Sequence, residues 1–150
     1  MLNKKILNFN ELNKIVKKNK KKSIVLCHGV FDLLHIGHIK HFEESKKLGD
    51  ILVVSLTKDE FVNKGPNRPV FNTNQRAEFI SRINFVDYVV INDFLTSEKI
   101  IKNLKPNIYS KGKDYKNNKV DVTNNINIEI NAVKSVKGKI HYTKSKKIDS

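Results

Sequence analysis

The sequence predicts an α/β protein built around a doubly wound parallel sheet, because short apolar strands alternate with amphipathic helices along the chain. Two runs, 23–27 and 51–56, are rich in Ile, Leu and Val, as is typical of parallel strands covered on both faces. Three shorter segments, 86–91, 108–110 and 139–142, complete five predicted strands. In such sheets, ligands bind beyond the carboxyl ends of the strands.

Helices are predicted where apolar residues recur at intervals of three or four. The segments are 9–18, 36–48, 74–83, 97–104 and 122–136. Core-facing positions are expected at Ile36, Ile39 and Phe42 in the second helix and at Phe79, Ile80 and Ile83 in the third. Asn72 or Thr73 would cap the third helix. The expected architecture is a three-layer, Rossmann-like domain over residues 1–150, with five parallel strands flanked by helices.

Composition excludes several classes of protein. Cys27 is the single cysteine, which rules out an internal disulfide framework and fits the cytoplasm. No apolar stretch approaches the roughly 20 residues of a membrane span, so no membrane partner is expected. The net charge of +14 would suit nucleic acid, but the lysines are scattered and their runs lack interleaved aromatic residues. We therefore expect solvated basic faces whose field draws anionic substrates inward, and no nucleic-acid partner.

The segment 29–38, G-V-F-D-L-L-H-I-G-H, is the most informative part of the chain. It leaves the first predicted strand through a glycine turn and places His35 and His38 on one face of the next helix. Glycine lets the backbone approach an anion, and the first N–H groups of a helix point toward it. We therefore expect both imidazoles to reach one phosphate of a polyphosphate ligand, with Gly37 permitting close approach.

The extended signature G-V-F-D-L-L-H-I-G-H-I-K-H-F-E-E-S-K-K-L-G-D resembles that of the cytidylyltransferase-like nucleotidylyltransferases. The wider pattern, with K-G-P-N-R-P-V at 64–70 and K-G-K-D-Y at 111–115, is similar to glycerol-3-phosphate cytidylyltransferases and to heptose-phosphate adenylyltransferase domains. The resemblance implies transfer of a nucleoside monophosphate from ATP or CTP to a sugar or polyol phosphate, with release of pyrophosphate, for surface glycan precursors. It also implies a homodimer, and Mg²⁺ is expected to be bound mainly through the nucleotide phosphates.

Roles for individual residues follow from the motifs and the resemblance together. The expected catalytic residues are His35, His38 and Lys64. The expected nucleotide-binding residues are Gly29, Val30, Phe31, Gly37, Gly112 and Asp114. The expected substrate-binding residues are Asp32, Asp59, Arg68 and Arg76. Three residues keep alternatives open: Asp32 could orient the turn, act through a metal ion or have a purely structural Asx role, Asp59 could cap a helix, and Arg76 could form a surface ion pair.

Other histidines and the last segment complete the expectations. His28, His41 and His141 are expected to be non-catalytic, with His41 facing solvent, and no residue spacing suggests a protein metal site. Family members usually carry a hydroxyl-rich segment that binds the β- and γ-phosphates, whereas this sequence has T-K-S-K-K-I-D-S from Thr143. Either Lys144 and Ser145 partly substitute, or the chain is the N-terminal part of a longer one. The alternative functions are a non-catalytic nucleotide-binding module and a basic nucleic-acid-binding domain.

Overall fold

The computed structural model describes residues 4–62, 65–112 and 125–144. These residues form a six-stranded sheet in which every neighbouring pair of strands is parallel, in the order β1-β4-β3-β2-β5-β6. The strands are β1 (Ile6–Asn8), β2 (Ile24–Gly29), β3 (Ile51–Thr57), β4 (Tyr88–Asn92), β5 (Ile108–Gly112) and β6 (Lys139–Thr143). The predicted α/β fold class is confirmed.

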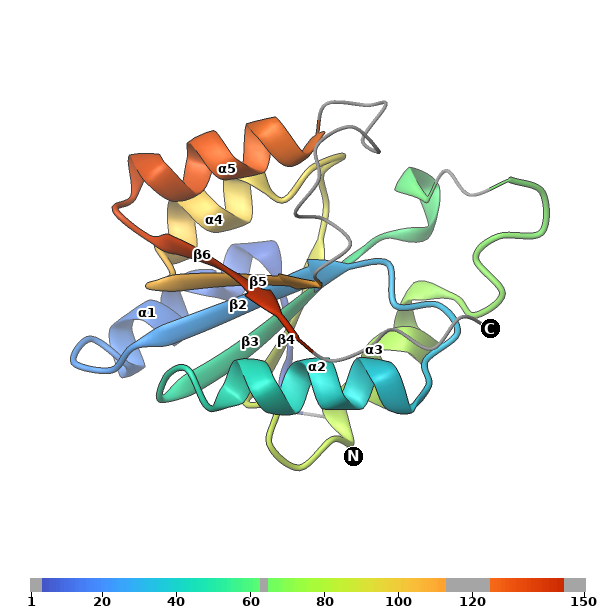
Figure 1. Cartoon of the computed structure of the whole chain (residues 1–150). Helices are drawn as coiled ribbons and strands as arrows, with labels where there is room; N and C mark the ends of the chain where they lie inside the picture. Colours follow the sequence, from blue (N-terminus) through green and yellow to red (C-terminus); the bar gives the residue numbers. More distant parts are fainter. Residues whose placement is uncertain (1–3, 63–64, 113–124, 145–150) are drawn as a thin grey trace.

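Helices cover both faces of this sheet (Figure 1). They are η1 (Phe9–Glu11), α1 (Leu12–Lys18), α2 (Ile36–Lys46), η2 (Asp59–Phe61), α3 (Thr73–Ser81), α4 (Glu98–Leu104) and α5 (Asn125–Ser135). One core cluster joins the sheet to α1, α4 and α5, and the other joins it to α2 and α3. Residues of β3 belong to both clusters: Val53 packs in the first and Val54 in the second. The strand is apolar because both of its faces are covered.

The strand order places the winding reversal beside β2. From β2 the chain winds through β3 to β4 on one side, and then crosses to β5 and β6 on the other side. The crevice between the carboxyl ends of β2 and β5 is therefore the expected ligand site of this fold. Gly29 ends β2 and Gly112 ends β5 at this edge of the sheet.

Three features differ from the sequence-based expectations. A sixth strand, β1, pairs with β4 at the edge of the sheet. Ile36 and Phe79 were expected to face the core but are 50% and 51% exposed, because Ile36 is the first residue of α2 and Phe79 borders an open groove.

Asn72 caps α3, as predicted, in a reciprocal pair with Gln75. None of the helices in the described ranges has the length and apolar character needed to cross a bilayer.

Candidate functional site

The turn after β2 is shaped by an aromatic side chain folded back on a glycine. The ring of Phe31 lies so close to Gly29 that a Cβ at this position would come within 2.9 Å of it. The same ring packs edge-on against Phe42 of α2, with centroids 5.1 Å apart. Phe31 adopts a left-handed backbone conformation, with φ of 53°, which costs about 1–2 kcal/mol for a residue other than glycine. The turn therefore directs the chain sharply from β2 into α2.

His35 and His38 come together at the start of α2. His35 is the N-cap residue, and its Nδ1 accepts a hydrogen bond from the Gly37 amide at 3.0 Å. The Nδ1 of His38 accepts from the His35 amide at 3.2 Å, and the two ring centroids lie 4.2 Å apart. Because Nδ1 accepts in both rings, each neutral imidazole carries its proton on Nε2. The hydrogen bonds thus assign both side chains as Nε2–H donors. A phosphate oxygen can accept a hydrogen bond from such a group.

The remaining histidines lie apart from this pair, with His28 on β2, His41 on α2 and His141 on β6. His28 shares a 2.7 Å hydrogen bond with Ser55, and burial lowers its pKa to about 4. His41 was expected to face solvent, but it is half-buried against β6 and bonds Thr143 at 2.8 Å. Burial lowers the pKa of His41 to about 4 as well, so both imidazoles are neutral at pH 7. His141 pairs with Glu44 of α2 at 3.0 Å.

Asp32 holds the loop that precedes α3. Its carboxylate accepts from the amides of Val70 and Phe71, at 2.7 and 2.9 Å, and from the Arg68 guanidinium at 3.2 Å. Burial alone would raise the pKa of Asp32, but these three donors outweigh it and keep the pKa below its ordinary value. The carboxylate therefore has a structural role, because it joins the turn after β2 to the loop before α3. Arg68 remains partly exposed at the surface of the same loop.

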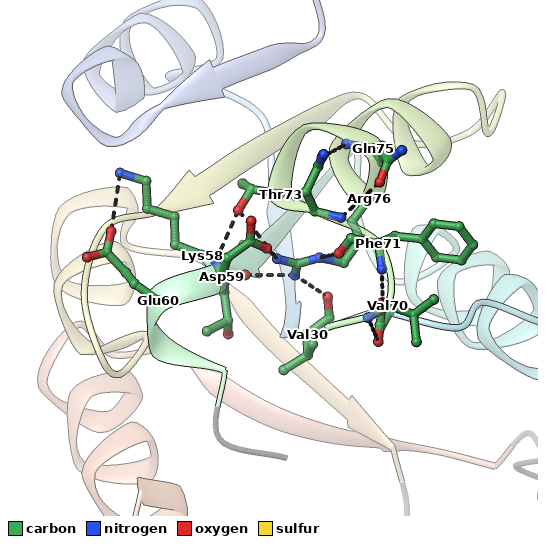
Figure 2. Close-up of polar contacts among 12 residues, drawn as sticks. Val30, Lys58, Asp59, Glu60, Val70, Phe71, Thr73, Gln75 and Arg76 are labelled. Carbon is green, nitrogen blue, oxygen red and sulfur yellow. Dashed lines mark hydrogen bonds and ion pairs between the residues drawn. The ribbon is translucent and has the colours of Figure 1, made fainter. Parts of the chain in front are cut away.

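The structure corrects the prediction that Arg76 contacts the substrate. Its side chain is fully buried, and all five N–H groups of the guanidinium donate to protein oxygens (Figure 2). The acceptors are the carbonyls of Phe71, Val30 and Thr57, the Asp59 carboxylate and the Thr73 hydroxyl. Arg76 is thus neither a surface ion pair nor placed to bind a substrate. It ties the ends of β2 and β3 to the start of α3, and acts as a positioning residue.

Asp59 is the ionic partner of this guanidinium. Its carboxylate lies 2.6 Å from the Arg76 Nη2, and its backbone amide donates to the Thr73 hydroxyl at 3.1 Å. Burial raises the pKa of Asp59, but the hydrogen bonds from Arg76 and Thr73 outweigh it, and the net shift is downward. The N-cap position of η2 belongs to Lys58, so the predicted alternative of a capping Asp59 is wrong. The Asp59 side chain remains 43% exposed.

Two of the expected site residues, Lys64 and Asp114, lie outside the described residues, and their contacts stay predictions. Gly112 lies at the end of β5, in register with Thr143 of β6. Among the described residues, no three His, Cys, Asp or Glu side chains come together as a metal site.

An open groove of about 590 Å³ runs between the turn after β2 and α3, lined by apolar side chains that include Leu33, Phe71 and Phe79.

Sequence reasoning missed two charged residues at this end of the sheet, Lys111 on β5 and Glu129 on α5. Both are buried, although they belong to residue types that are almost never fully buried without a partner. A signal was present for Glu129, because it falls between Ile126 and Val133 on the apolar face of its helix. A charged residue at such a core-facing position indicates a buried partner.

Comparison with known proteins defines the class of this domain. The profile of the cytidylyltransferase-like family matches residues 26–149. The chain belongs to the cytidylyltransferase-like family and is a nucleotidylyltransferase domain, which confirms the resemblance that its motifs carry.

Two curated relatives show how similar the sequences are. The Bifunctional protein HldE of Campylobacter jejuni (strain RM1221) is 49% identical over 115 residues, which are 75% of this chain and 25% of the relative. That of Aliarcobacter butzleri (strain RM4018) is 40% identical over 141 residues, which are 91% of this chain and 29% of the relative. The chain thus spans between a quarter and three-tenths of the length of these curated relatives.

Two solved structures share the fold. The lipopolysaccharide core biosynthesis protein from Thermoplasma volcanium GSS1 has a TM-score of 0.67 and 32% identity, and the match covers 84% of this chain and 99% of that one. The pantoate-beta-alanine ligase from Francisella tularensis has a TM-score of 0.63 with 17% identity, over 92% of this chain and 66% of that one. The second likeness is one of fold alone.

Proposed function

We propose that this chain transfers a nucleoside monophosphate from ATP or CTP to a sugar or polyol phosphate. A phosphate oxygen of the acceptor forms a bond to the α-phosphorus, the bond from the α-phosphorus to the bridging oxygen of the β-phosphate breaks, and pyrophosphate leaves. The observation that carries this proposal is the pairing of His35 and His38 at the start of α2, with both rings assigned as Nε2–H donors. Phosphoryl-type transfer needs mainly such donors, placed where negative charge develops.

The other residues support this chemistry by position. Asp32 and Arg76 hold the turn and the loop on either side of the histidine pair. Lys64 and Arg68 are proposed as cations for the triphosphate or for the acceptor phosphate, and Arg68 already lies at the surface of the loop that Asp32 holds. Gly29, Gly112 and Asp114 are proposed to border the nucleoside.

Mg²⁺ is proposed as the cofactor. Of the three carboxylates expected at the site, the two in the described part of the chain are engaged by protein donors, Asp32 by two amides and Arg68, and Asp59 by Arg76. This arrangement fits an ion that is held mainly by phosphate oxygens of the nucleotide, with few protein ligands. Such an ion would neutralise charge on the triphosphate.

The acceptor class is proposed from the motifs and the relatives. The K-G-x-x-R-P-V and K-G-K-D-Y segments favour the heptose-phosphate branch over the glycerol-phosphate branch. The relative from Thermoplasma volcanium is described as a lipopolysaccharide core biosynthesis protein, which agrees with a role in surface glycan precursors. We place the reaction in the cytoplasm, where nucleoside triphosphates are made and where a single buried cysteine stays reduced.

The partner proposed besides the substrates is a second copy of the chain. Leu33, Phe71 and Phe79 border the groove and are each more than two-fifths exposed, so they form an exposed apolar patch of the kind that marks interaction sites. Glu78 and Arg82 line the same groove and pair with each other at 3.0 Å within one copy, and a two-fold axis can also place these opposite charges facing each other across an interface. Light scattering of the wild type and of Phe79→Ser tests this association, with a monomeric variant as the expected result.

The activity is tested by pyrophosphate release. The chain is incubated with ATP or CTP, Mg²⁺ and a panel of sugar phosphates, in parallel with His38→Ala and with His141→Gln as a matched histidine control. We expect release with at least one pair of substrates, lowered about 10²–10³-fold in His38→Ala and unchanged in the control. Binding of a triphosphate without release would favour the non-catalytic module. Salt-sensitive binding of single-stranded DNA, with no binding of a triphosphate, would favour the nucleic-acid alternative.

A further inference from the structure

The ends of β2 and β5 separate where the winding of the sheet reverses. The ladder between β2 and β3 runs from Ile24 to Gly29, whereas the ladder between β2 and β5 covers two pairs, Val25↔Ile108 and Leu26↔Tyr109. Both strands continue beyond these pairs toward the carboxyl edge. The strands that flank the expected nucleotide crevice are therefore not held together by backbone hydrogen bonds at the crevice itself.

One side chain spans this separation. The ammonium of Lys111, near the end of β5, donates to the backbone carbonyl of His28 at 3.2 Å. His28 immediately precedes Gly29, where the turn that leads to the histidine pair begins. Because the Lys111 side chain is only 6% exposed, this contact lies inside the fold and not on its surface.

A buried carboxylate holds the ammonium in place. Glu129 of α5 approaches the Lys111 Nζ with its Oε2 at 3.7 Å, and its side chain is 8% exposed. Its other oxygen accepts from the Ser97 hydroxyl at 2.8 Å, and Ser97 in turn pairs with the Tyr109 hydroxyl at 3.1 Å. Since Ser97 has one proton and donates it to Glu129, the Tyr109 hydroxyl is the donor to Ser97.

The carboxylate of Glu129 stays charged in spite of burial. Burial alone would raise the pKa of Glu129, but the positive charge of Lys111 and the hydrogen bond from Ser97 keep the pKa below its ordinary value. Replacing a buried ion pair with apolar residues of similar size is often neutral or even stabilising. The pair is therefore better explained by the geometry that it imposes than by a gain in stability.

We propose that Lys111, held by Glu129, is a positioning residue that sets the separation between the ends of β2 and β5 and thereby the width of the nucleotide crevice. This inference rests on the proposed function for its ligand, a nucleoside triphosphate. Lys111 acts through the backbone of His28 and Gly29, which leads into the turn of Phe31 and onward to His35. It is not itself a catalytic residue.

The test compares the same substitution at two positions, one at the carboxyl ends of the strands and one near their amino ends. Lys111→Met removes the ammonium and keeps an unbranched side chain. Lys46→Met is the matched control, because Lys46 pairs with Asp87 at 2.8 Å and Asp87 accepts from the Leu52 amide near the start of β3, at the far edge from the crevice. Lys111→Arg, which keeps a positive donor, is the conservative variant. The measurements are the dissociation constants for ATP and CTP with Mg²⁺, made well below each unfolding temperature, and hydrogen exchange of the backbone amides of residues 28–31.

We expect Lys111→Met to raise the dissociation constant of the preferred triphosphate about tenfold or more and to speed exchange at residues 28–31. Lys111→Arg should recover most of the affinity, and Lys46→Met should change neither quantity. Equal loss of affinity in the two methionine variants, or wild-type exchange at residues 28–31 in Lys111→Met, would overturn the inference. If the wild type binds no triphosphate, the proposed function fails, and the exchange data still decide whether Lys111 joins the two strand ends.

Discussion

Acidification from pH 7 to pH 5 is expected to destabilise this fold through His28 and His41. Burial lowers the pKa of each imidazole to about 4 from an ordinary value of 6.5. Lys111 faces both rings and adds to the lowering, whereas Glu129 beside His28 and Glu44 beside His41 oppose it. Between these two pH values the unfolded chain binds more protons than the folded one, so stability must fall as the pH falls.

The size of the effect follows from the two pKa values. At pH 5 an unfolded imidazole is about 97% protonated and a folded one with a pKa near 4 about 10%, which corresponds to about 2 kcal/mol for each histidine. Together the two residues would remove about 4 kcal/mol, a large part of the roughly 5–15 kcal/mol that stabilises a typical domain. The lowered pKa values of Asp32, Asp59 and Glu129 act only at more acidic pH, because their unfolded forms titrate near 4.

Urea unfolding followed by circular dichroism at pH 7, 6 and 5, at constant ionic strength, measures this loss. His28→Asn keeps a polar group facing Ser55 and should reduce the loss by about half. A free energy of unfolding that stays constant from pH 7 to pH 5, or a full loss in His28→Asn, would refute the assignment of the two neutral imidazoles.

Three further predictions concern the turn after β2 and its supports. Arg76→Met should lower the free energy of unfolding by about 3–5 kcal/mol in urea titrations, because the acceptors around the guanidinium lose their donors. Gly29→Ala should cost about 1–3 kcal/mol and lower kcat/KM in the pyrophosphate assay, since the added methyl group meets the Phe31 ring. Asp32→Asn should speed hydrogen exchange at the Val70 amide, because a neutral amide oxygen is a weaker acceptor than the carboxylate, and unchanged exchange would contradict this role.

The layered fold could be predicted because its signals are local. A strand that is apolar at every position, such as β3, must be covered on both faces, and amphipathic helices between such strands supply the cover. The edge strand β1 carries no such signal. It is three residues long and owes its structure to pairing with Val89–Ile91, more than eighty positions later in the chain. A local sequence pattern cannot indicate that a strand pairs with a segment so far away along the chain.

Helical periodicity identifies which face of a helix is apolar but not whether another element covers it. Phe79 has the spacing of a core residue, and its neighbour Ile80 is fully buried. The two differ because Ile80 points to the sheet while Phe79 borders the groove beside the turn after β2. Likewise, the spacing of His35 and His38 predicts that they meet, but their Nε2–H assignment depends on backbone amides that only the folded turn positions.

The roles of Asp32 and Arg76 depend on a convergence that no spacing reveals. Asp32 accepts from the amide of Phe71 at 2.9 Å, and Arg76 donates to the carbonyl of the same residue at 2.9 Å. One peptide segment is thus held from the turn after β2 and from α3 at once. Because Arg76 also donates to the carbonyl of Val30, the loop before α3 and the turn that leads to His35 must move together. The charged residues with the strictest positions here are therefore those that shape the backbone around the histidine pair.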